Sequence, residues 1–142
     1  MWNSGWKKEG LDKILALKKN FPPAGEFYNA NDADRFIKDG VIQYVFAQRI
    51  DWAKKLVDSK KEFIADGFPS VKMTFYNVFY RFYAETRQPE DQDIFDIFIS
   101  CAAPYIDIFI TEKFQAEIFK KVKSRDSFLS HLQIETDEFI SR

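Results

Sequence analysis

Cysteine and histidine are almost absent from this chain, which limits the chemistry open to it. Its 142 residues include one cysteine, Cys101, and one histidine, His131. A single cysteine excludes an internal disulfide, and one residue of each kind excludes a zinc site built from cysteine and histidine ligands. The sequence also lacks a glycine-rich phosphate loop and the spacings of paired histidine ligands. A metal bound here would therefore need oxygen ligands.

Long apolar runs and an excess of one charge are also missing. No apolar run approaches the roughly 18 residues that span a bilayer, and the first residues lack the apolar core of a signal peptide. We therefore expect a cytoplasmic protein with no membrane partner. With 21 basic and 22 acidic residues the formal net charge is −1, so no global positive field attracts the chain to nucleic acid. RNA binding would need a local basic face.

Aromatic residues, in contrast, are abundant. The chain is 46% hydrophobic and 18% aromatic and contains 16 phenylalanines. Disordered chains lack such a composition, and the length suits one domain with a sizeable core. We interpret residues 1–142 as a single domain, helical over 1–90 and built as helix–strand–helix–strand over 91–142.

Apolar residues at helical spacing run through most of the first 90 residues. They predict a short amphipathic helix over Leu11–Asn20 and a long helical stretch over 31–67, continuous or divided near Gly40. A further helix starts at Pro69, and its apolar and tyrosine stripes indicate burial on several sides. A row of aromatic side chains can also stack on nucleic-acid bases, but the helical spacing favours packing in a core.

The last third of the chain combines helices with two strands. Acidic residues after Pro89 indicate a helix start, and Pro104 ends that helix. Strands are predicted near 106–111 and 131–135, and a helix from Glu112 connects them in the order of a right-handed βαβ unit. The sequence thus predicts a helix-rich α/β fold with about five helices and a small parallel sheet.

Two parallel strands are too few for an independent sheet. Parallel pairs are normally covered on both faces and belong to larger sheets. No third strand is evident in residues 1–90, where the best fragment is Glu26–Tyr28. Because an open edge is a template for association, we expect a hidden strand near 21–31, a strand from a second copy, or a missing segment that completes the sheet.

Several carboxylates are expected near the ends of the first strand and its neighbouring helix. Asp93 and Asp96 are three residues apart and share a helix face, and Glu112 directly follows the strand. Open α/β sheets place their chemistry at the carboxyl ends of their strands, and an all-oxygen cluster suits Mg²⁺ or Mn²⁺. Asp93 and Glu112 also lie where acids stabilise a helix N-terminus, so a purely structural role stays open.

The segment Asp93–Lys113, with the sequence DIFDIFISCAAPYIDIFITEK, resembles the C-terminal half of a PIN-like domain. In that family an aspartate opens a helix of small and apolar residues, and a hydrophobic strand then ends in threonine and an acid. A helix and a final strand follow. On this match Asp96, or alternatively Asp93, resembles the helix aspartate, and Thr111 with Glu112 resembles the pair at the strand end.

The resemblance covers Asp91–Phe139 and implies a metal-dependent endoribonuclease whose acids hold Mg²⁺ or Mn²⁺. The metal ligands would be Asp93, Asp96 and Glu112, and the phosphate contacts Lys113, Lys120 and Lys121. The family's N-terminal strand, which ends in an aspartate followed shortly by an asparagine, has no counterpart here. Glu112 also stands where the family has an aspartate. The chain therefore resembles an incomplete PIN-like domain, the C-terminal portion of a longer one.

Two other interpretations remain open. The chain is alternatively a non-catalytic helical α/β module that acts through protein–protein association, with its acids serving only at helix ends. A small-molecule pocket among the aromatic side chains has no motif in its support. The partners implied are RNA for the nuclease, and a second copy or a further segment of the protein for the open sheet.

Overall fold

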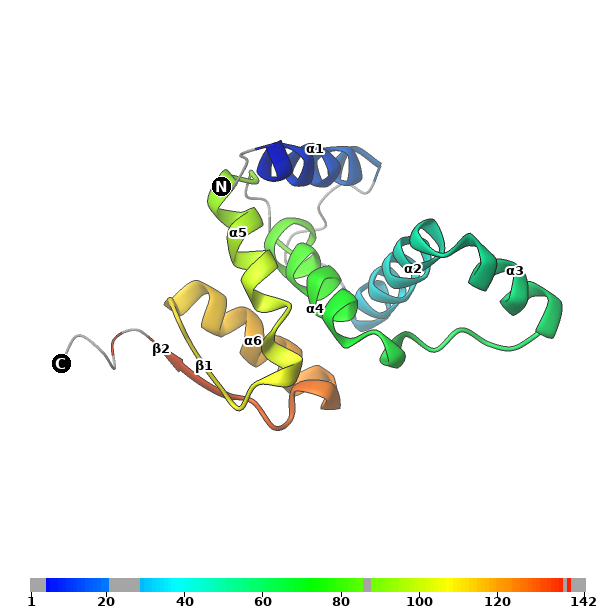
Figure 1. Cartoon of the computed structure of the whole chain (residues 1–142). Coiled ribbons are helices and arrows are strands. Elements are labelled where there is room, and N and C mark those ends of the chain that lie inside the picture. Colours follow the sequence, from blue (N-terminus) through cyan, green and yellow to red (C-terminus); the bar gives the residue numbers. More distant parts are fainter. Residues whose placement is uncertain (1–4, 21–28, 86–87, 137, 139–142) are drawn as a thin grey trace.

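Figure 1 shows the computed structural model of the chain, which describes residues 5–20, 29–85, 88–136 and 138. The α-helices are α1 (Gly5–Asn20), α2 (Ala30–Gln48), α3 (Ile50–Ser59), α4 (Pro69–Val78), α5 (Asp91–Ser100) and α6 (Lys113–Arg125). The strands are β1 (Ile108–Thr111) and β2 (Gln133–Thr136). The predicted helix-rich α/β class is confirmed, with six α-helices and a two-stranded parallel sheet in the described ranges.

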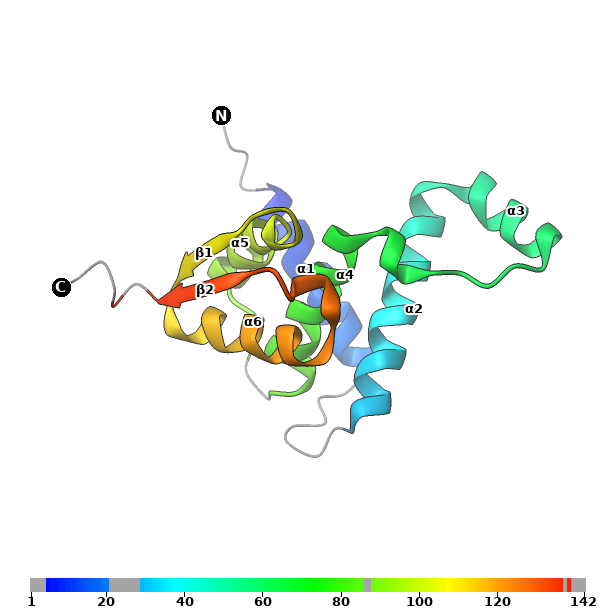
Figure 2. The same ribbon diagram turned by 90° about the horizontal axis from the view of Figure 1, so that it is seen from below.

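Helix α4 lies at the centre of the molecule, between α2 and α5 (Figures 1 and 2). Helix α1 packs on α5, and α6 lies with the sheet at the side away from α3. The core is made of side chains from α2, α4, α6 and the turn before β2, among them Val41, Met73, Phe79, Phe119 and Leu132. Within the ranges that the structure describes, no helix combines the length and the apolarity needed to cross a membrane.

Helix α2 begins at a capping box and passes through Gly40 without a break. The side chain of Asn29 accepts the backbone N–H of Asp32, and the side chain of Asp32 accepts the N–H of Asn29. A Cβ atom on Gly40 would lie 2.4 Å from the Phe75 ring, so glycine here permits close packing of α2 on α4. The suggested division near Gly40 is therefore wrong, and the helical stretch divides at Arg49 instead.

Helix α4 continues into a π-helical segment, η3 (Phe79–Tyr83), which widens the last turn. The backbone N–H of Ala84 bonds to the carbonyl of Phe79 at 2.8 Å, a span of five residues. Segments of this kind are rare and often occur at functional sites. Arg81 lies inside this turn and is only 1% exposed, so the segment places a cation in the interior.

The sheet consists of β1 and β2 in parallel, paired from Ile108 with Gln133 to Thr111 with Thr136. Both strands are shorter than predicted, at four residues each. Their carboxyl ends point the same way, toward the start of α6 (Figure 2). The fragment Glu26–Tyr28 lies outside the described residues, and the part of the chain that is described contains no third strand.

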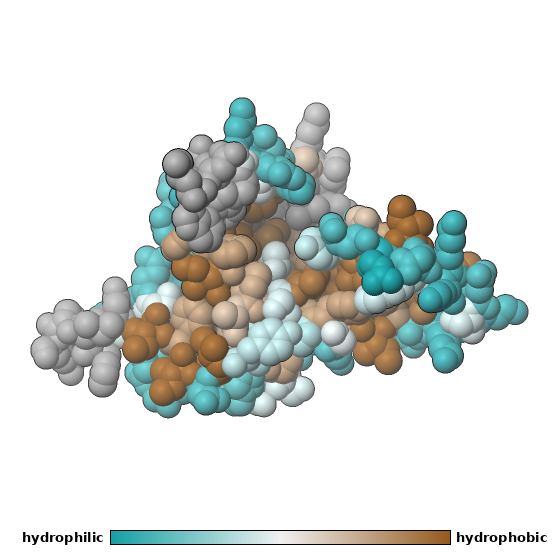
Figure 3. Space-filling view, viewed as in Figure 1, coloured by the Kyte–Doolittle hydropathy of each residue, from teal (hydrophilic) through white to brown (hydrophobic). Residues whose placement is uncertain are grey.

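Among the described residues, α6 covers one face of the sheet and the other face is largely exposed. Phe109 of β1 packs on Phe119 of α6, with ring centroids 4.6 Å apart. On the opposite face Ile108 and Ile110 are 52% and 48% exposed, and Figure 3 shows hydrophobic surface over the strands. The pair is the small parallel sheet that the sequence predicts, and a further strand that completes it stays a prediction.

Candidate functional site

The centre of the candidate site is a buried ion pair between Arg81 and Asp93. Arg81 Nη1 lies 2.7 Å from Asp93 Oδ1, and the two side chains are 1% and 2% exposed. The second oxygen, Asp93 Oδ2, accepts the backbone N–H of Glu90 at 2.8 Å. The side chain of Glu90 accepts the N–H of Asp93 in return, which completes a capping box at the start of α5. Both carboxylate oxygens of Asp93 are therefore engaged.

Asp96 lies one turn further along α5 and is closer to solvent. Its Oδ2 atom is 3.7 Å from Arg81 Nη2, and its side chain is 21% exposed. Its Oδ1 atom accepts a hydrogen bond from Gln92 at 3.2 Å. Arg81 thus partly neutralises Asp96 as well, but leaves its carboxylate accessible to water.

The same guanidinium connects α5 to the start of α6. Arg81 Nη2 donates a hydrogen bond to Gln115 Oε1, and the guanidinium carbon of Arg81 lies 5.1 Å from the centre of the Phe114 ring. Glu112 occupies the N-cap position of α6, immediately after β1, and is exposed without a side-chain capping bond. Arg81 therefore brings the acids of α5 and the strand-end segment that contains Glu112 into one region.

A chain of buried hydrogen bonds extends this contact. Gln115 Nε2 donates to Asn77 Oδ1 at 3.0 Å, and Asn77 Nδ2 donates to Ser100 Oγ at 2.7 Å. Ser100 Oγ in turn donates to the carbonyl of Ile97 at 2.7 Å. Buried polar groups that are paired in this way fix the relative orientation of their elements. Here they fix α4, α5 and α6, the three helices around the candidate site.

The oxygen donors differ in how well they suit a metal ion. Among the described residues, no group of three or more His, Cys, Asp or Glu side chains is arranged to hold one. Asp93 would have to give up its contacts with Arg81 and Glu90. Asp96 and Glu112 reach solvent, and Mg²⁺ is commonly held by one or two carboxylates together with water and substrate phosphate. Each of these two residues, taken singly, offers the oxygen donor chemistry that Mg²⁺ prefers.

The predicted phosphate-binding lysines lie on α6 and do not form one uniform positive face. Lys120 pairs with Glu117 at 3.2 Å, and Lys121 Nζ lies 5.7 Å from the centre of the Tyr80 ring. Lys113 is exposed in the first turn of α6, next to Glu112. Lys113 is therefore the best placed of the three to contact a phosphate near the acids.

A second buried charge, Lys72, was not anticipated from the sequence. It is 6% exposed, and its Nζ atom lies 2.5 Å from Asp66 and 2.6 Å from Asp126. Burial lowers the pKa of Lys72, but hydrogen bonds to Asp126 and Asp66 outweigh it and raise the pKa overall. Burial, followed by a hydrogen bond to Asp126, raises the pKa of Tyr76 far above its ordinary range. This cluster ties α4 to the end of α6 and has no free nucleophile.

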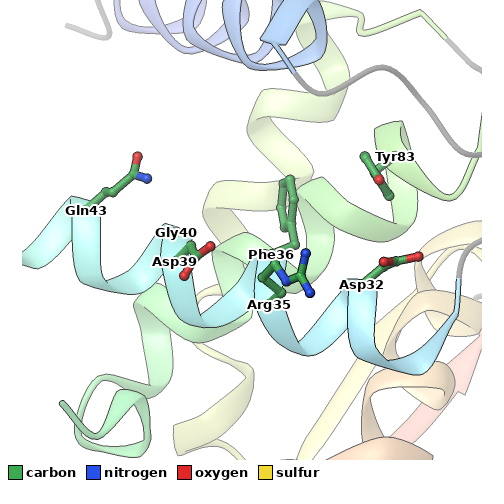
Figure 4. A pocket seen from close by; sticks show the side chains of 7 residues that line it. All are labelled: Asp32, Arg35, Phe36, Asp39, Gly40, Gln43 and Tyr83. Atoms are coloured by element: carbon green, nitrogen blue, oxygen red, sulfur yellow. The ribbon is translucent and has the colours of Figure 1, made fainter. Parts of the chain in front are cut away.

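A small pocket of about 160 Å³ lies over α2 (Figure 4). It is lined by Asp32, Arg35, Phe36, Asp39, Gly40, Gln43 and Tyr83. Asp32 already serves the capping box of α2, and the rings of Phe36 and Tyr83 pack on each other with centroids 5.7 Å apart. None of the predicted site residues lines this pocket, so it adds nothing to the candidate site.

Arg81, Asn77 and Gln115, the polar residues that organise the site, were not predicted from the sequence. Arg81 and Asn77 interrupt the aromatic stripe of α4 and η3, and a polar residue inside an apolar helix face is the signal that identifies them. Asp93 was predicted at a helix start, which the capping box bears out. The ion pair between Asp93 and Arg81 was not predicted.

The order α5, β1, α6, β2 is the order that the sequence predicts for this portion of the chain. Asp96 and the segment after β1 meet at Arg81, which is the main geometric fact about the site. Comparisons with protein-family models, with curated proteins and with solved structures found no match to this chain.

Proposed function

We propose that the chain is the C-terminal portion of a PIN-like, metal-dependent endoribonuclease. The supporting observation is that Arg81 contacts both Asp96 on α5 and Gln115 on α6, three residues after Glu112. Glu112 directly follows β1, and the proposal is that Asp96 acts with it at the carboxyl end of that strand, where open α/β sheets carry their chemistry. The last strand of the family pattern, β2, lies parallel to β1 as that pattern requires.

In this proposal the residues have separate roles. Asp96 and Glu112 would hold Mg²⁺ or Mn²⁺, which supplies an activated water and neutralises charge on a phosphodiester. Asp93 holds Arg81, and Arg81 orients Asp96, so both are positioning residues. Lys113 contacts an RNA phosphate near Glu112. A further carboxylate comes from the strand that completes the sheet.

The test is a Mn²⁺ titration followed by thermal unfolding. A specific ligand at 100 times its dissociation constant adds about 2.7 kcal/mol of stability, so we expect a saturable rise in Tm for the wild type. Asp96→Asn should lose that rise. Asp91→Asn, an exposed acid on the same helix, should keep it. No saturable rise in the wild type, or an equal rise in Asp96→Asn, contradicts the nuclease proposal.

The second candidate is a non-catalytic module that acts by association, and the uncovered sheet favours it. Ile108 and Ile110 face away from α6, and Phe98 and Tyr105 of the preceding segment are 56% and 68% exposed. In the part of the chain that the structure describes, β1 pairs with β2 alone, and the other edge of such a strand can pair with a further strand. In this reading a second copy covers the sheet, and the acids serve only the helix start and the ion pair.

Light scattering during size-exclusion chromatography tests this candidate. We expect the wild type to form a dimer as concentration rises, and Ile108→Lys with Ile110→Lys to remain monomeric. Leu15→Lys, a matched change at an exposed apolar position of α1, should dimerise like the wild type. A wild type that stays monomeric throughout removes self-association, whatever the outcome with Mn²⁺.

A further inference from the structure

A hydrophobic groove of about 530 Å³ lies between α3 and the segment that follows it. Its floor is formed by Phe46, Trp52, Leu56, Phe63 and Phe68. The rings pack in sequence: Phe46 on Phe63 at 5.6 Å, Phe63 on Phe68 at 5.7 Å, and Trp52 on Phe68 at 6.1 Å between centroids. This groove shares no residue with the site around Arg81.

Helix α3 is amphipathic, but none of its residues is buried. Ile50 and Val57 are 65% and 74% exposed, and Ile64 beside the groove is 68% exposed. Figures 1 and 2 show α3 projecting from the body beyond the end of α2. In Figure 3 this end of the molecule is mostly hydrophilic, with hydrophobic patches beside it. Helices with one apolar face normally bury that face. Trp52 and Leu56 present one side of α3 to the groove, whereas Ile50 and Val57 lie on the other side of the helix. The groove itself, with Ile64 at its side, is therefore the candidate docking surface.

The charge around the groove is opposite in sign to that of the chain as a whole. Residues 49–62 contain five basic and three acidic side chains, a net charge of +2, although the chain carries −1. The charged residues that line the groove itself are Lys55, Lys61 and Glu62. Glu62 is paired with Lys38 at 3.3 Å, so the lining keeps a net positive charge. A partner with acidic side chains flanking an apolar surface is complementary to this arrangement.

Other anionic ligands match the groove less well. Single-stranded RNA needs free ring faces for its bases, but Phe63 and Phe68 stack on each other, and Arg49 lies 4.3 Å from the centre of the Trp52 ring. A bilayer is flat, and a hollow surface cannot insert into it. A second α3 segment would bring a like net charge toward Lys55 and Lys61.

We propose that this groove binds an acidic amphipathic helix of a partner protein. Apolar side chains at positions i, i+3 or i+4, and i+7 of the partner enter the groove over Leu56 and Phe63, as in helix-in-groove recognition. Acidic side chains on the flanks of that helix pair with Lys55 and Lys61. The proposal is independent of the nuclease proposal, because it uses no residue of the site around Arg81.

A synthetic helix provides the probe. We would use a fluorescein-labelled peptide of about 16 residues, about 24 Å long as a helix, with leucines on one face and glutamates on the other, and follow its fluorescence anisotropy. We expect saturable binding that weakens about tenfold or more, about 1.4 kcal/mol, in Lys55→Glu with Lys61→Glu. Leu56→Asp should abolish it. Lys113→Glu with Lys120→Glu, on α6, is the matched control and should bind like the wild type.

Each variant changes a side chain that is not buried, and far-ultraviolet circular dichroism confirms that it folds. No binding of the acidic peptide at about 1 mM, a concentration that detects even weak complexes, overturns the proposal. Equal binding of a peptide with lysines in place of the glutamates also overturns it. So does binding of oligouridylate or phosphatidylserine vesicles at Lys55 and Lys61 in place of the acidic peptide.

Discussion

Arg81→Met tests the central ion pair of the structure. Arg81 and Asp93 are 1% and 2% exposed and 2.7 Å apart, so removal of the guanidinium leaves a buried carboxylate without its cation. Breaking a buried pair in this way costs about 3–5 kcal/mol. We expect the lower end of that range, about 3 kcal/mol, because Asp93 keeps its bond from the N–H of Glu90.

Urea unfolding followed by circular dichroism measures this change. For a chain of this size about 3 kcal/mol corresponds to a fall in Tm of about 10 °C. In a double-mutant cycle, Arg81→Met with Asp93→Asn should cost less than the two single changes added together, because neither charge is then left alone. The control is Lys120→Met, which removes the exposed pair with Glu117 and should cost less than about 1 kcal/mol. A cost below about 1 kcal/mol for Arg81→Met, or an additive cycle, refutes the reasoning.

Two further predictions concern packing and pH. Gly40→Ala should lower stability by about 1 kcal/mol in urea unfolding, because the Cβ contact of 2.4 Å with Phe75 outweighs the helix propensity of alanine. Gly67→Ala, where nothing lies within 4 Å, should change stability little, and equal costs would contradict the argument. Burial raises the pKa of Asp126, but hydrogen bonds, chiefly from Lys72, bring it below its usual 3.8. Its contribution is therefore present above that pH and lost as pH falls through the folded pKa, so Tm measured from pH 7 downward should fall less steeply in acid for Asp126→Asn than for the wild type. Equal slopes of Tm against pH for Asp126→Asn and the wild type would contradict a stabilising role for the ionised Asp126.

The order of elements was predictable because helical and strand periods are local properties of the sequence. The apolar spacing gave α4, α5 and α6, and the alternation around Ile108 and Ile110 gave β1. The break after α2 was misplaced because glycine in a helix has two explanations, a break or a close approach. The short distance from Gly40 to the Phe75 ring shows that this glycine permits a close approach of two helices. That contact depends on the tertiary fold and cannot be predicted from the local sequence.

The candidate site was predictable in part for the same reason. The spacing of Asp93 and Asp96 and the position of Glu112 after a strand follow from the sequence. Arg81, the partner of the two aspartates, cannot be predicted in this way, because its side chain is directed inward at the π-helical end of α4. A long-range ion pair of this kind leaves no periodic signal.

Direct measurement of Mn²⁺ binding is the sharpest test of the proposal that Asp96 and Glu112 hold a metal ion. The electron paramagnetic resonance signal of free Mn²⁺ falls when the ion binds, so a titration counts the sites. We expect one saturable weak site that is lost in Asp96→Asn and in Glu112→Gln and kept in Asp91→Asn. Absence of a saturable site, or a site that survives either Asp96→Asn or Glu112→Gln, would contradict the nuclease proposal.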